Sequence, residues 1–243
     1  MNEQPSPAST VVLLRDGMDG IETLLMRRVA SMAFAPGMHV FPGGRVDERD
    51  HEATVTIIGG DVDELARRAS TDAAGLRAFY SCAVRETLEE VGVALTDPTC
   101  DGSLVVDVTA LPLIDHWVTP EREGRRYDVR FFGAMITGDD ARLTTTEADH
   151  VAWRRPQDAL AEADEGKVRL LPPTEAVLRW LATESSASAA LMAGAHRPVV
   201  PLMPRLVEPG HWMLVHAYTG EVLRDPVPGP HTREDNGQPR EDA

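Results

Sequence analysis

The chain has 243 residues, of which 42% are hydrophobic, and a formal net charge of −15. This apolar content suffices for a real core, and the acidic balance argues against nucleic acid and anionic membranes as partners. The sequence has no apolar run long enough to span a membrane, no secretory signal at its N-terminus and no metal-ligand spacing of its two cysteines, so we expect a cytoplasmic protein.

The first half of the chain shows strand patterns followed by a strong helix pattern. We expect residues 1–8 to be a disordered lead into a domain over residues 9–183. Apolar runs and turn residues predict strands at 10–15, 21–28 and 38–41, irregular structure at 45–60 and a short helix at 61–69. The strongest helix covers residues 72–91 and ends at Gly92, because apolar residues recur at steps of three and four. These residues are Leu76, Phe79, Ala83, Val84, Leu88 and Val91.

The second half continues with strands and helices and then changes in composition. Strands are predicted at 103–107, 111–118, 127–137 and 150–154, and helices at 156–164 and 173–183. We expect residues 184–225 to form a C-terminal extension that packs on the domain or on a dimer partner. Residues 226–243 are rich in proline, glycine and charge, which predicts a disordered tail.

Three glutamates crowd the end of the predicted helix. Glu86, Glu89 and Glu90 stand at i, i+3 and i+4, which places them on one helix face. Arg85 can pair with Glu89 and so relieve part of their repulsion. Mg²⁺ and Mn²⁺ prefer such oxygen ligands. A solvated helix face would carry the same residues, so the helix alone leaves a metal site and an ordinary surface as alternatives.

A second motif upstream completes a family resemblance. The stretch RETLEEVGV, residues 85–93, resembles the second half of the Nudix box, whose pattern is G-x5-E-x7-R-E-U-x-E-E-x-G-U with U apolar. In FPGGRVD, Gly44 resembles the box glycine and Asp47 the acidic residue three positions later, while Asp50 stands in place of the first box glutamate. Gly44 and Arg85 are 41 positions apart instead of the family's 14, so the resemblance implies an insertion of about 27 residues, placed at about 51–72.

The insertion and the flanking motifs resemble one branch of the Nudix hydrolases, which contains the peroxisomal coenzyme A diphosphatase and its bacterial relatives. The resemblance is carried in order by LLMRRVASMAFAPGMHVFPGGRVDERD, RRYDVRFFGAMI and EADHVAWRRPQDALAEADEGKVRLLPPTEAVLRWL. It covers about residues 9–183. It implies an α+β fold, namely a Nudix α/β/α sandwich with a mixed sheet, an insertion inside the box and a C-terminal extension.

The resemblance implies a metal-dependent hydrolase that cleaves the diphosphate bridge of a nucleoside diphosphate linked to a group X. Coenzyme A or acyl-coenzyme A, giving 3′,5′-ADP and (acyl-)phosphopantetheine, is the expected substrate. The segment FAPGMHV departs from the upstream coenzyme A signature of other Nudix families, so an ADP-ribose- or NADH-type nucleotide is the alternative. A non-catalytic nucleotide-sensing module is a third hypothesis, against which the intact box glutamates argue. The family is also compatible with a homodimer.

The resemblance assigns roles to the box residues. Glu86, Glu89 and Glu90, together with the Gly43 carbonyl, are the expected ligands of Mg²⁺ or Mn²⁺. Arg85 is expected to orient Glu89 or Glu90 from outside the metal's own ligand set. In this family the general base is either a box glutamate or a glutamate on a later loop, and both alternatives stay open here.

Residues outside the box complete the expected site. Glu147 occupies the later loop that supplies the base in some family members. Arg27 and Arg28 end a predicted strand, and Arg45 follows the glycine pair. Arginine binds phosphate with two hydrogen bonds at once, so these three arginines are the expected substrate contacts.

Overall fold

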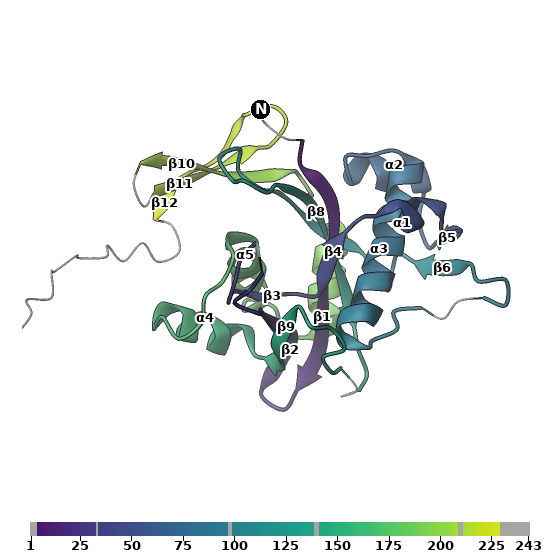
Figure 1. Ribbon diagram of the computed structural model, residues 1–243, viewed down its shortest axis with the longest axis horizontal. Coiled ribbons are helices and arrows are strands. Elements are labelled where there is room, and N and C mark those ends of the chain that lie inside the picture. Colours follow the sequence, from purple (N-terminus) through teal and green to yellow (C-terminus); the bar gives the residue numbers. More distant parts are fainter. Residues whose placement is uncertain (1–3, 33, 97–98, 139–140, 209–210, 229–243) are drawn as a thin grey trace, which may run out of the picture.

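The computed structural model describes residues 4–32, 34–96, 99–138, 141–208 and 211–228. A mixed sheet runs through the described part, with strands in the order β12-β11-β10-β7-β8-β1-β2-β3, while β4 pairs with β1 and β9 with β2 (Figure 1). Its strands are β1 (Ser6–Gly17), β2 (Gly20–Arg28), β3 (His39–Val40), β4 (Gly43–Arg45), β7 (Leu113–Val118), β8 (Tyr127–Met135), β9 (Ala148–Arg154), β10 (Leu202–Glu208), β11 (His211–His216) and β12 (Val222–Pro228). A second, parallel pair consists of β5 (Val55–Ile58) and β6 (Leu104–Asp107).

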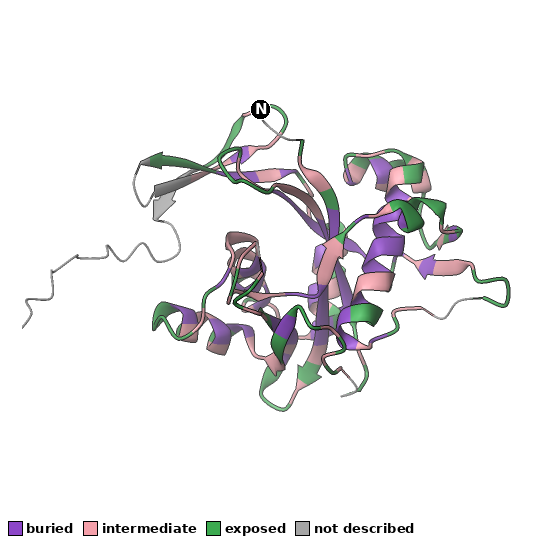
Figure 2. Cartoon of the chain, in the orientation of Figure 1, coloured by how far each residue is buried: buried purple, intermediate pink, exposed green. Residues whose placement is uncertain are grey.

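Helices cover both faces of the main sheet. One layer holds α1 (Glu48–Glu52), α2 (Val62–Arg68) and α3 (Ala73–Val91), and the other holds α4 (Pro156–Asp164), α5 (Pro172–Leu181) and α6 (Ala187–His196). Side chains alternate along β1, so that Val11 and Leu13 join the core under α2 and α3 while Val12 and Leu14 join the core under the other layer. Buried residues accordingly follow β1, β8 and α3 in Figure 2. The predicted α/β/α sandwich with a mixed sheet is confirmed.

The strand β1 begins earlier than expected. It starts at Ser6, so residues 6–8 are not part of a disordered lead. The strand runs parallel to β8 from Ser6, opposite Tyr127, to Leu14, opposite Met135. It also pairs with β4, and Ser9 donates a hydrogen bond of 2.7 Å to the Phe79 carbonyl. The small and polar residues of this stretch conceal the strand in the sequence, because a central strand is usually read from its large apolar side chains.

The expectation of irregular structure at residues 45–60 is wrong in part. This stretch contains the end of β4, the short helix α1 and the strand β5. The segment inserted between the two halves of the box therefore has its own structure. Its strand β5 pairs with β6, and its helix α2 starts at the N-cap Asp61, whose side chain accepts a hydrogen bond from the Glu64 N–H. The insertion packs against α3, and Arg68 of α2 also donates hydrogen bonds to the carbonyls of Gly194 and Arg197 at the end of α6.

The C-terminal extension packs on the domain that precedes it. Helix α6 lies against β7 and β8, and β10 continues the sheet beyond β7 through the pairing of Leu202 with Trp117. The Tyr218 hydroxyl donates a hydrogen bond of 2.9 Å to Asp128 on β8. Strand β12 runs past the expected boundary at residue 225, and residues 229–243 of the expected tail lie outside the described part. No described helix is long and apolar enough to cross a membrane.

Candidate active site

The C-terminal half of α3 carries the glutamate face. The helix ends at Gly92, whose left-handed backbone (φ 69°) closes it as predicted. Leu88 belongs to the apolar pattern of the helix, but it is 50% exposed. The inward positions belong to Thr87, whose hydroxyl donates a hydrogen bond to the Ala83 carbonyl, and to Glu90, which is only 6% exposed. A buried carboxylate in place of an apolar side chain needs a partner, so this part of the helix is not an ordinary solvated face.

Two glycines bring β4 against that face. The Gly43 N–H donates a hydrogen bond of 2.7 Å to Glu90 Oε2, which fixes the buried carboxylate. A Cβ on Gly43, whose φ is +156°, would lie 2.3 Å from the Ser9 carbonyl oxygen. A Cβ on Gly44 would lie 2.3 Å from Glu86 Oε1. Only glycine at both positions lets β4 approach the β1 backbone and the carboxylates together.

Asp50 joins the two separated halves of the box. Its carboxylate accepts two hydrogen bonds from Arg85, at 2.6 Å from Nη2 and 3.0 Å from Nε. Ser81 Oγ donates a third at 3.1 Å, and Asp50 is 1% exposed. The alignment of Asp50 with the first box glutamate was made on the sequence alone. Its two-point ion pair with Arg85 supports this alignment, because the inserted residues leave the two halves in contact.

Two arginines hold the outer glutamates. Arg85 Nη1 lies 2.6 Å from Glu86 Oε1 and 3.3 Å from Glu89 Oε2. Arg49, on α1, lies 3.1 Å from the other oxygen of Glu89. Arg85 was expected to orient Glu89 or Glu90. The structure shows its contact with Glu89, while Glu90 takes its hydrogen bond from the β4 backbone instead.

The glutamate face holds more negative charge than its surroundings offset. Burial raises the pKa of Glu90 to about 8; the Gly43 N–H opposes this rise, and the carboxylates of Glu86 and Glu147 reinforce it. Burial also raises the pKa of Glu86, against the opposing effect of Arg85. Both shifts arise because a carboxylate charge is poorly solvated here and has like charges as neighbours. A cation bound between these groups would remove that cost.

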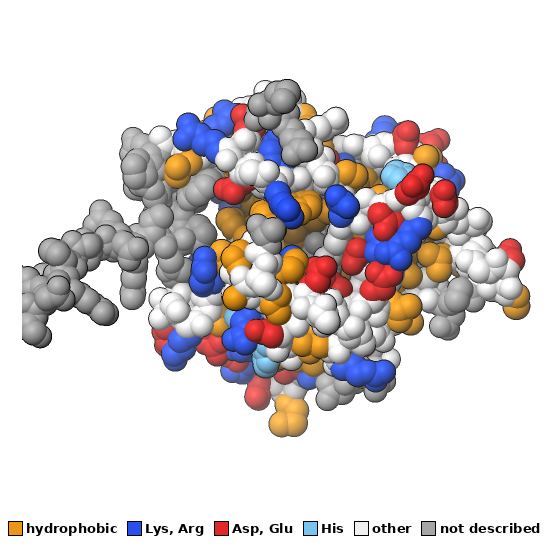
Figure 3. Space-filling model, viewed as in Figure 1, with side chains coloured by type: hydrophobic (Ala, Val, Ile, Leu, Met, Phe, Trp, Pro, Cys, Tyr) orange, Lys and Arg blue, Asp and Glu red, His pale blue; other side chains and the backbone are white. Residues whose placement is uncertain are grey.

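The glutamates border a cavity of about 940 Å³, within the size range of small-molecule sites. Its lining combines acidic and basic side chains with a set of apolar and aromatic ones. The apolar and aromatic lining residues include Met32, Phe34, Met38, Trp117, Tyr127, Val129 and Pro204. The rings of Phe34 and Tyr127 meet edge to face, with centroids 5.1 Å apart. Figure 3 shows the hollow near the centre of the side of the molecule that is drawn, with hydrophobic side chains inside and charged ones at its border.

Comparison with known proteins identifies the family. The NUDIX domain model matches residues 5–174. The chain belongs to the NUDIX family. This confirms the family that the displaced box predicted, and it confirms that the fold is that of a NUDIX domain carrying an insertion and an extension.

Individual relatives agree with the predicted branch. Acyl-coenzyme A diphosphatase NUDT19 of Gallus gallus and that of Xenopus laevis are each 24% identical to the chain, over 63% of it and over 58% and 57% of their own lengths. The chain thus spans less than two thirds of these relatives. The crystal structure of a NUDIX hydrolase from Alicyclobacillus acidocaldarius is 27% identical, with a TM-score of 0.67, and the match covers 82% of this chain and 100% of that one.

The structure brings most of the predicted NUDIX site residues together. The following line the cavity: Gly43, Arg85, Glu86, Glu89, Glu90, Arg28, Arg45 and Glu147. Arg28 Nη2 lies 3.9 Å from Glu147 Oε2, and the charge of Glu147 contributes to the raised pKa of Glu90, so the later loop lies near the glutamate helix. Arg27 is not among the lining residues and pairs with Asp149 at 2.7 Å. The expectation that Arg27 contacts substrate is therefore unsupported, because adjacent residues of a strand point to opposite sides and only Arg28 points inward.

The donor set of this face fits a hard divalent cation. It offers three carboxylates on one helix, one of them buried and raised in pKa, next to a glycine turn that leaves no room for a Cβ. In the conformation seen here, no three acidic, histidine or cysteine side chains of the described residues are arranged to hold a metal ion. Arg49 and Arg85 instead draw Glu89 and Glu86 towards themselves. The residues that would hold the ion are therefore present, with arginines as their current partners.

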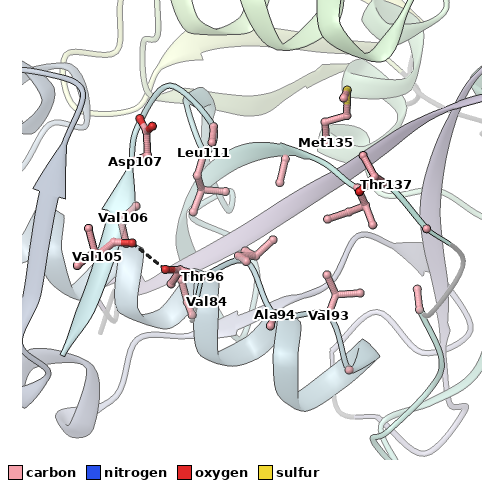
Figure 4. Close-up of a pocket in the computed structure, with 17 residues that line it drawn as sticks. Val84, Val93, Ala94, Thr96, Val105, Val106, Asp107, Leu111, Met135 and Thr137 are labelled. Atoms are coloured by element: carbon pink, nitrogen blue, oxygen red, sulfur yellow. Dashed lines mark hydrogen bonds between the residues drawn. The ribbon is translucent and has the colours of Figure 1, made fainter. Parts of the chain in front are cut away.

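A second cavity of about 500 Å³ lies beyond the C-terminal end of α3. Figure 4 shows it between the segment after the helix, β6 and the end of β8, with Thr96 Oγ1 donating a hydrogen bond to the Val105 carbonyl. Its lining is mostly apolar, and Asp107 is the charged side chain among the lining residues. That single carboxylate already accepts hydrogen bonds from the Thr109 hydroxyl and N–H. This cavity has no group of residues comparable to the box.

The sequence did not predict the role of Arg49 or the contact between the aromatic rings of Phe34 and Tyr127 in the cavity lining. Arg49 lies in the run DERD, where every residue is charged and nothing distinguishes the one that reaches Glu89. Phe34 and Tyr127 are separated by 93 positions in the sequence and meet only through the fold. Neither contact leaves a local pattern. The Arg49 contact depends on the packing of α1 against α3, and the Phe34–Tyr127 contact depends on how the loop after β2 meets the start of β8.

Proposed function

We propose that the chain is a diphosphatase that hydrolyses the phosphoanhydride bridge of a nucleoside diphosphate linked to a group X, with Mg²⁺ or Mn²⁺ as cofactor. The observation that carries this proposal is the face of Glu86, Glu89 and Glu90, which is positioned by Gly43 and Arg85 and lines a cavity of about 940 Å³. A diphosphate needs cationic partners, which the cation held by the glutamates and the side chains of Arg28 and Arg45 would supply. The rest of a nucleotide needs room, which the cavity provides.

The expected ligands of the cation are the three box glutamates and the Gly43 carbonyl. When bound, a divalent cation would neutralise phosphate oxygens and lower the pKa of the attacking water. Arg85 holds Glu86 and Glu89 in place and is itself fixed by Asp50. Its role is to keep two carboxylates pointing into the cavity while it stays out of the ligand set.

Two candidates for the general base line the cavity. One is a box glutamate, and the other is Glu147 on the loop before β9. Glu147 is 56% exposed at its side chain and lies within 3.9 Å of Arg28, so it is accessible to water. Its charge also reaches Glu90, whose pKa it raises. We favour Glu147 as the base if the box glutamates are all occupied as ligands.

Coenzyme A or acyl-coenzyme A is our leading substrate, with 3′,5′-ADP and (acyl-)phosphopantetheine as products. Two observations support this substrate. The two relatives are acyl-coenzyme A diphosphatases by name, and the lining of the cavity suits a nucleotide with an apolar part. Arg28 and Arg45 line the cavity and can contact phosphates, and part of its lining is apolar and aromatic. An ADP-ribose- or NADH-type nucleotide is the alternative, since a nucleobase could also stack on the rings of Phe34 and Tyr127.

The experiment is to incubate the chain with Mn²⁺ or Mg²⁺ and each of coenzyme A, acyl-coenzyme A, ADP-ribose, NADH and dinucleoside polyphosphates. Products are identified by mass. Release of 3′,5′-ADP from coenzyme A species alone supports the leading substrate. Turnover confined to ADP-ribose or NADH supports the alternative. Binding of these nucleotides without turnover of any of them would mean a nucleotide-sensing module and reject the enzyme.

A further inference from the structure

Arg49 has a position that the roles above do not explain. It lies on α1, within the charged run that precedes the insertion, and its side chain lines the cavity. Its Nε lies 2.8 Å from Asp47 Oδ2 and its Nη1 lies 3.1 Å from Glu89 Oε1. Glu89 is an expected ligand of the cation. The same carboxylate receives Arg85 on its other oxygen, at 3.3 Å, so arginines occupy both of its oxygens.

The two arginines on Glu89 differ in how firmly they are held. Arg85 is 14% exposed at its side chain, and the buried Asp50 binds it through two hydrogen bonds. Arg49 is 58% exposed, and both of its partners are open to solvent, with side-chain exposures of 36% for Asp47 and 45% for Glu89. An exposed ion pair is weak and easily exchanged, whereas a buried one is not. Arg49 is thus the arginine that can leave.

We propose that Arg49 is a displaceable counter-cation of the glutamate face. It neutralises Glu89 while that carboxylate has no metal, and it turns to the anionic diphosphate of the substrate once a divalent cation has taken Glu89. The inference rests on the proposed function, because it requires both a bound cation and a phosphate ligand. It assigns to Arg49 a positioning role before the metal binds and a substrate contact afterwards.

Charge and geometry favour this exchange. A divalent cation and a guanidinium compete for the same carboxylate oxygen, and the ion carries twice the charge on a smaller radius. The displaced guanidinium stays anchored through α1 beside the cavity, where a diphosphate would bring new negative charge. Its planar fork suits two phosphate oxygens as well as it suits a carboxylate. Glu89 would therefore have a cationic partner at each stage, first arginine and then metal.

The first test measures Mn²⁺ binding to the full chain without substrate, by titration calorimetry. Arg49→Gln removes the competitor, so the Kd for Mn²⁺ should fall about two- to fivefold, the range expected for loss of an exposed ion pair. Arg49→Lys keeps a competing cation and should stay within about twofold of the wild type. An unchanged Kd in Arg49→Gln would overturn the proposal. Thermal unfolding of each variant checks that the fold is retained.

Two control variants separate displacement from a general change of charge. Arg45→Gln removes the same charge from the same cavity, but within the described residues Arg45 forms no ion pair with a carboxylate. Arg179→Gln removes an arginine of equal exposure, 58%, whose partner is Glu175 outside the cavity. Both should leave the Kd for Mn²⁺ closer to the wild type than Arg49→Gln does. Equal tightening in Arg45→Gln would show a field effect only and reject the exchange.

The second test follows Arg49 after the metal binds. A crystal structure with Mn²⁺ and no substrate should show the Arg49 guanidinium away from Glu89, and retention of the contact with Mn²⁺ bound to Glu89 would overturn the proposal. With saturating Mn²⁺ and a substrate from the panel above, Arg49→Gln should raise KM about tenfold, as expected for loss of a charge-assisted hydrogen bond to phosphate. If the wild type binds no Mn²⁺ and hydrolyses nothing, the proposed function itself fails.

Discussion

Asp50 and Arg85 are 35 residues apart and form a two-point ion pair, with Nη2–Oδ2 and Nε–Oδ1 distances of 2.6 and 3.0 Å. The pair is shielded from solvent, since the Asp50 side chain is 1% and the Arg85 side chain 14% exposed. It links α1 to α3 across the inserted segment. The same arginine then contacts Glu86 and Glu89. The geometry of these proposed metal ligands on α3 therefore depends on an aspartate of α1.

We therefore predict that Asp50→Asn destabilises the protein. The change removes the buried charge of the two-point ion pair and leaves Arg85 with only the more exposed Glu86 and Glu89, which should lower the free energy of unfolding by about 3 kcal/mol. Asp47→Asn is the matched control, because Asp47 is 36% exposed and its distance to Arg85 is 3.9 Å. It should cost less than about 1 kcal/mol. Denaturant unfolding measures both, and equal losses in the two variants would contradict the special role of Asp50.

The glutamate face itself is tested by Glu89→Gln. This variant keeps the size of the side chain and its exposure but removes the charge of an expected metal ligand. Turnover should fall by at least about a hundredfold while the fold is retained, because metal sites tolerate the loss of a charged ligand poorly. Glu165→Gln, which alters an exposed carboxylate paired with Lys167, is the control and should keep wild-type turnover. Near-normal rates in Glu89→Gln would reject the metal assignment.

The parts of this site that the sequence predicted are those with local patterns. The spacing of Glu86, Glu89 and Glu90 fixes them on one face of a helix whatever the rest of the chain does. The glycine pair of β4 was recognisable because FPGGRVD resembles the start of the Nudix box. These two motifs, with the family resemblance, were enough to predict the fold class and the place of the site.

The parts that the sequence did not predict depend on tertiary contacts. Arg27 and Arg28 are adjacent and identical in type, so the sequence does not distinguish their roles. Because side chains alternate along β2, Arg27 pairs with Asp149 and Arg28 lines the cavity. Ser6 begins a central strand only because β8 lies alongside to pair with it. Leu88 fits the apolar period of α3, but a buried glutamate takes the inner position next to β4. In each case the deciding partner is distant in the sequence.

The raised pKa of Glu90 predicts how stability depends on pH without metal. The native pKa of Glu90 is about 8, against an ordinary value of 4.5 for glutamate, so between these values the folded chain holds a proton that the unfolded chain releases. Stability must then fall as pH rises from about 5 to 8. Glu90→Gln, which cannot ionise, should show a flatter profile over this range in denaturant unfolding. Parallel profiles for the variant and the wild type would contradict the buried, protonated state of Glu90.

The two glycines of β4 predict two different failures from the same substitution. In Gly44→Ala the new Cβ would lie 2.3 Å from Glu86 Oε1, the far end of a flexible side chain that can rotate away. The fold should survive, while Mn²⁺ affinity and turnover fall because a proposed ligand has been displaced. In Gly43→Ala the new Cβ would lie 2.3 Å from the Ser9 carbonyl oxygen, part of a central strand that cannot move.

Gly43→Ala should therefore lower the free energy of unfolding by more than about 2 kcal/mol, through strain at φ +156° and the clash with β1. Thermal unfolding and Mn²⁺ titration of both variants distinguish the two failures. Gly44→Ala should retain a melting temperature close to the wild type and lose metal affinity, whereas Gly43→Ala should lose the fold first. If Gly44→Ala binds Mn²⁺ as the wild type does, Glu86 is not a ligand, and the metal must be held by Glu89, Glu90 and groups outside the box.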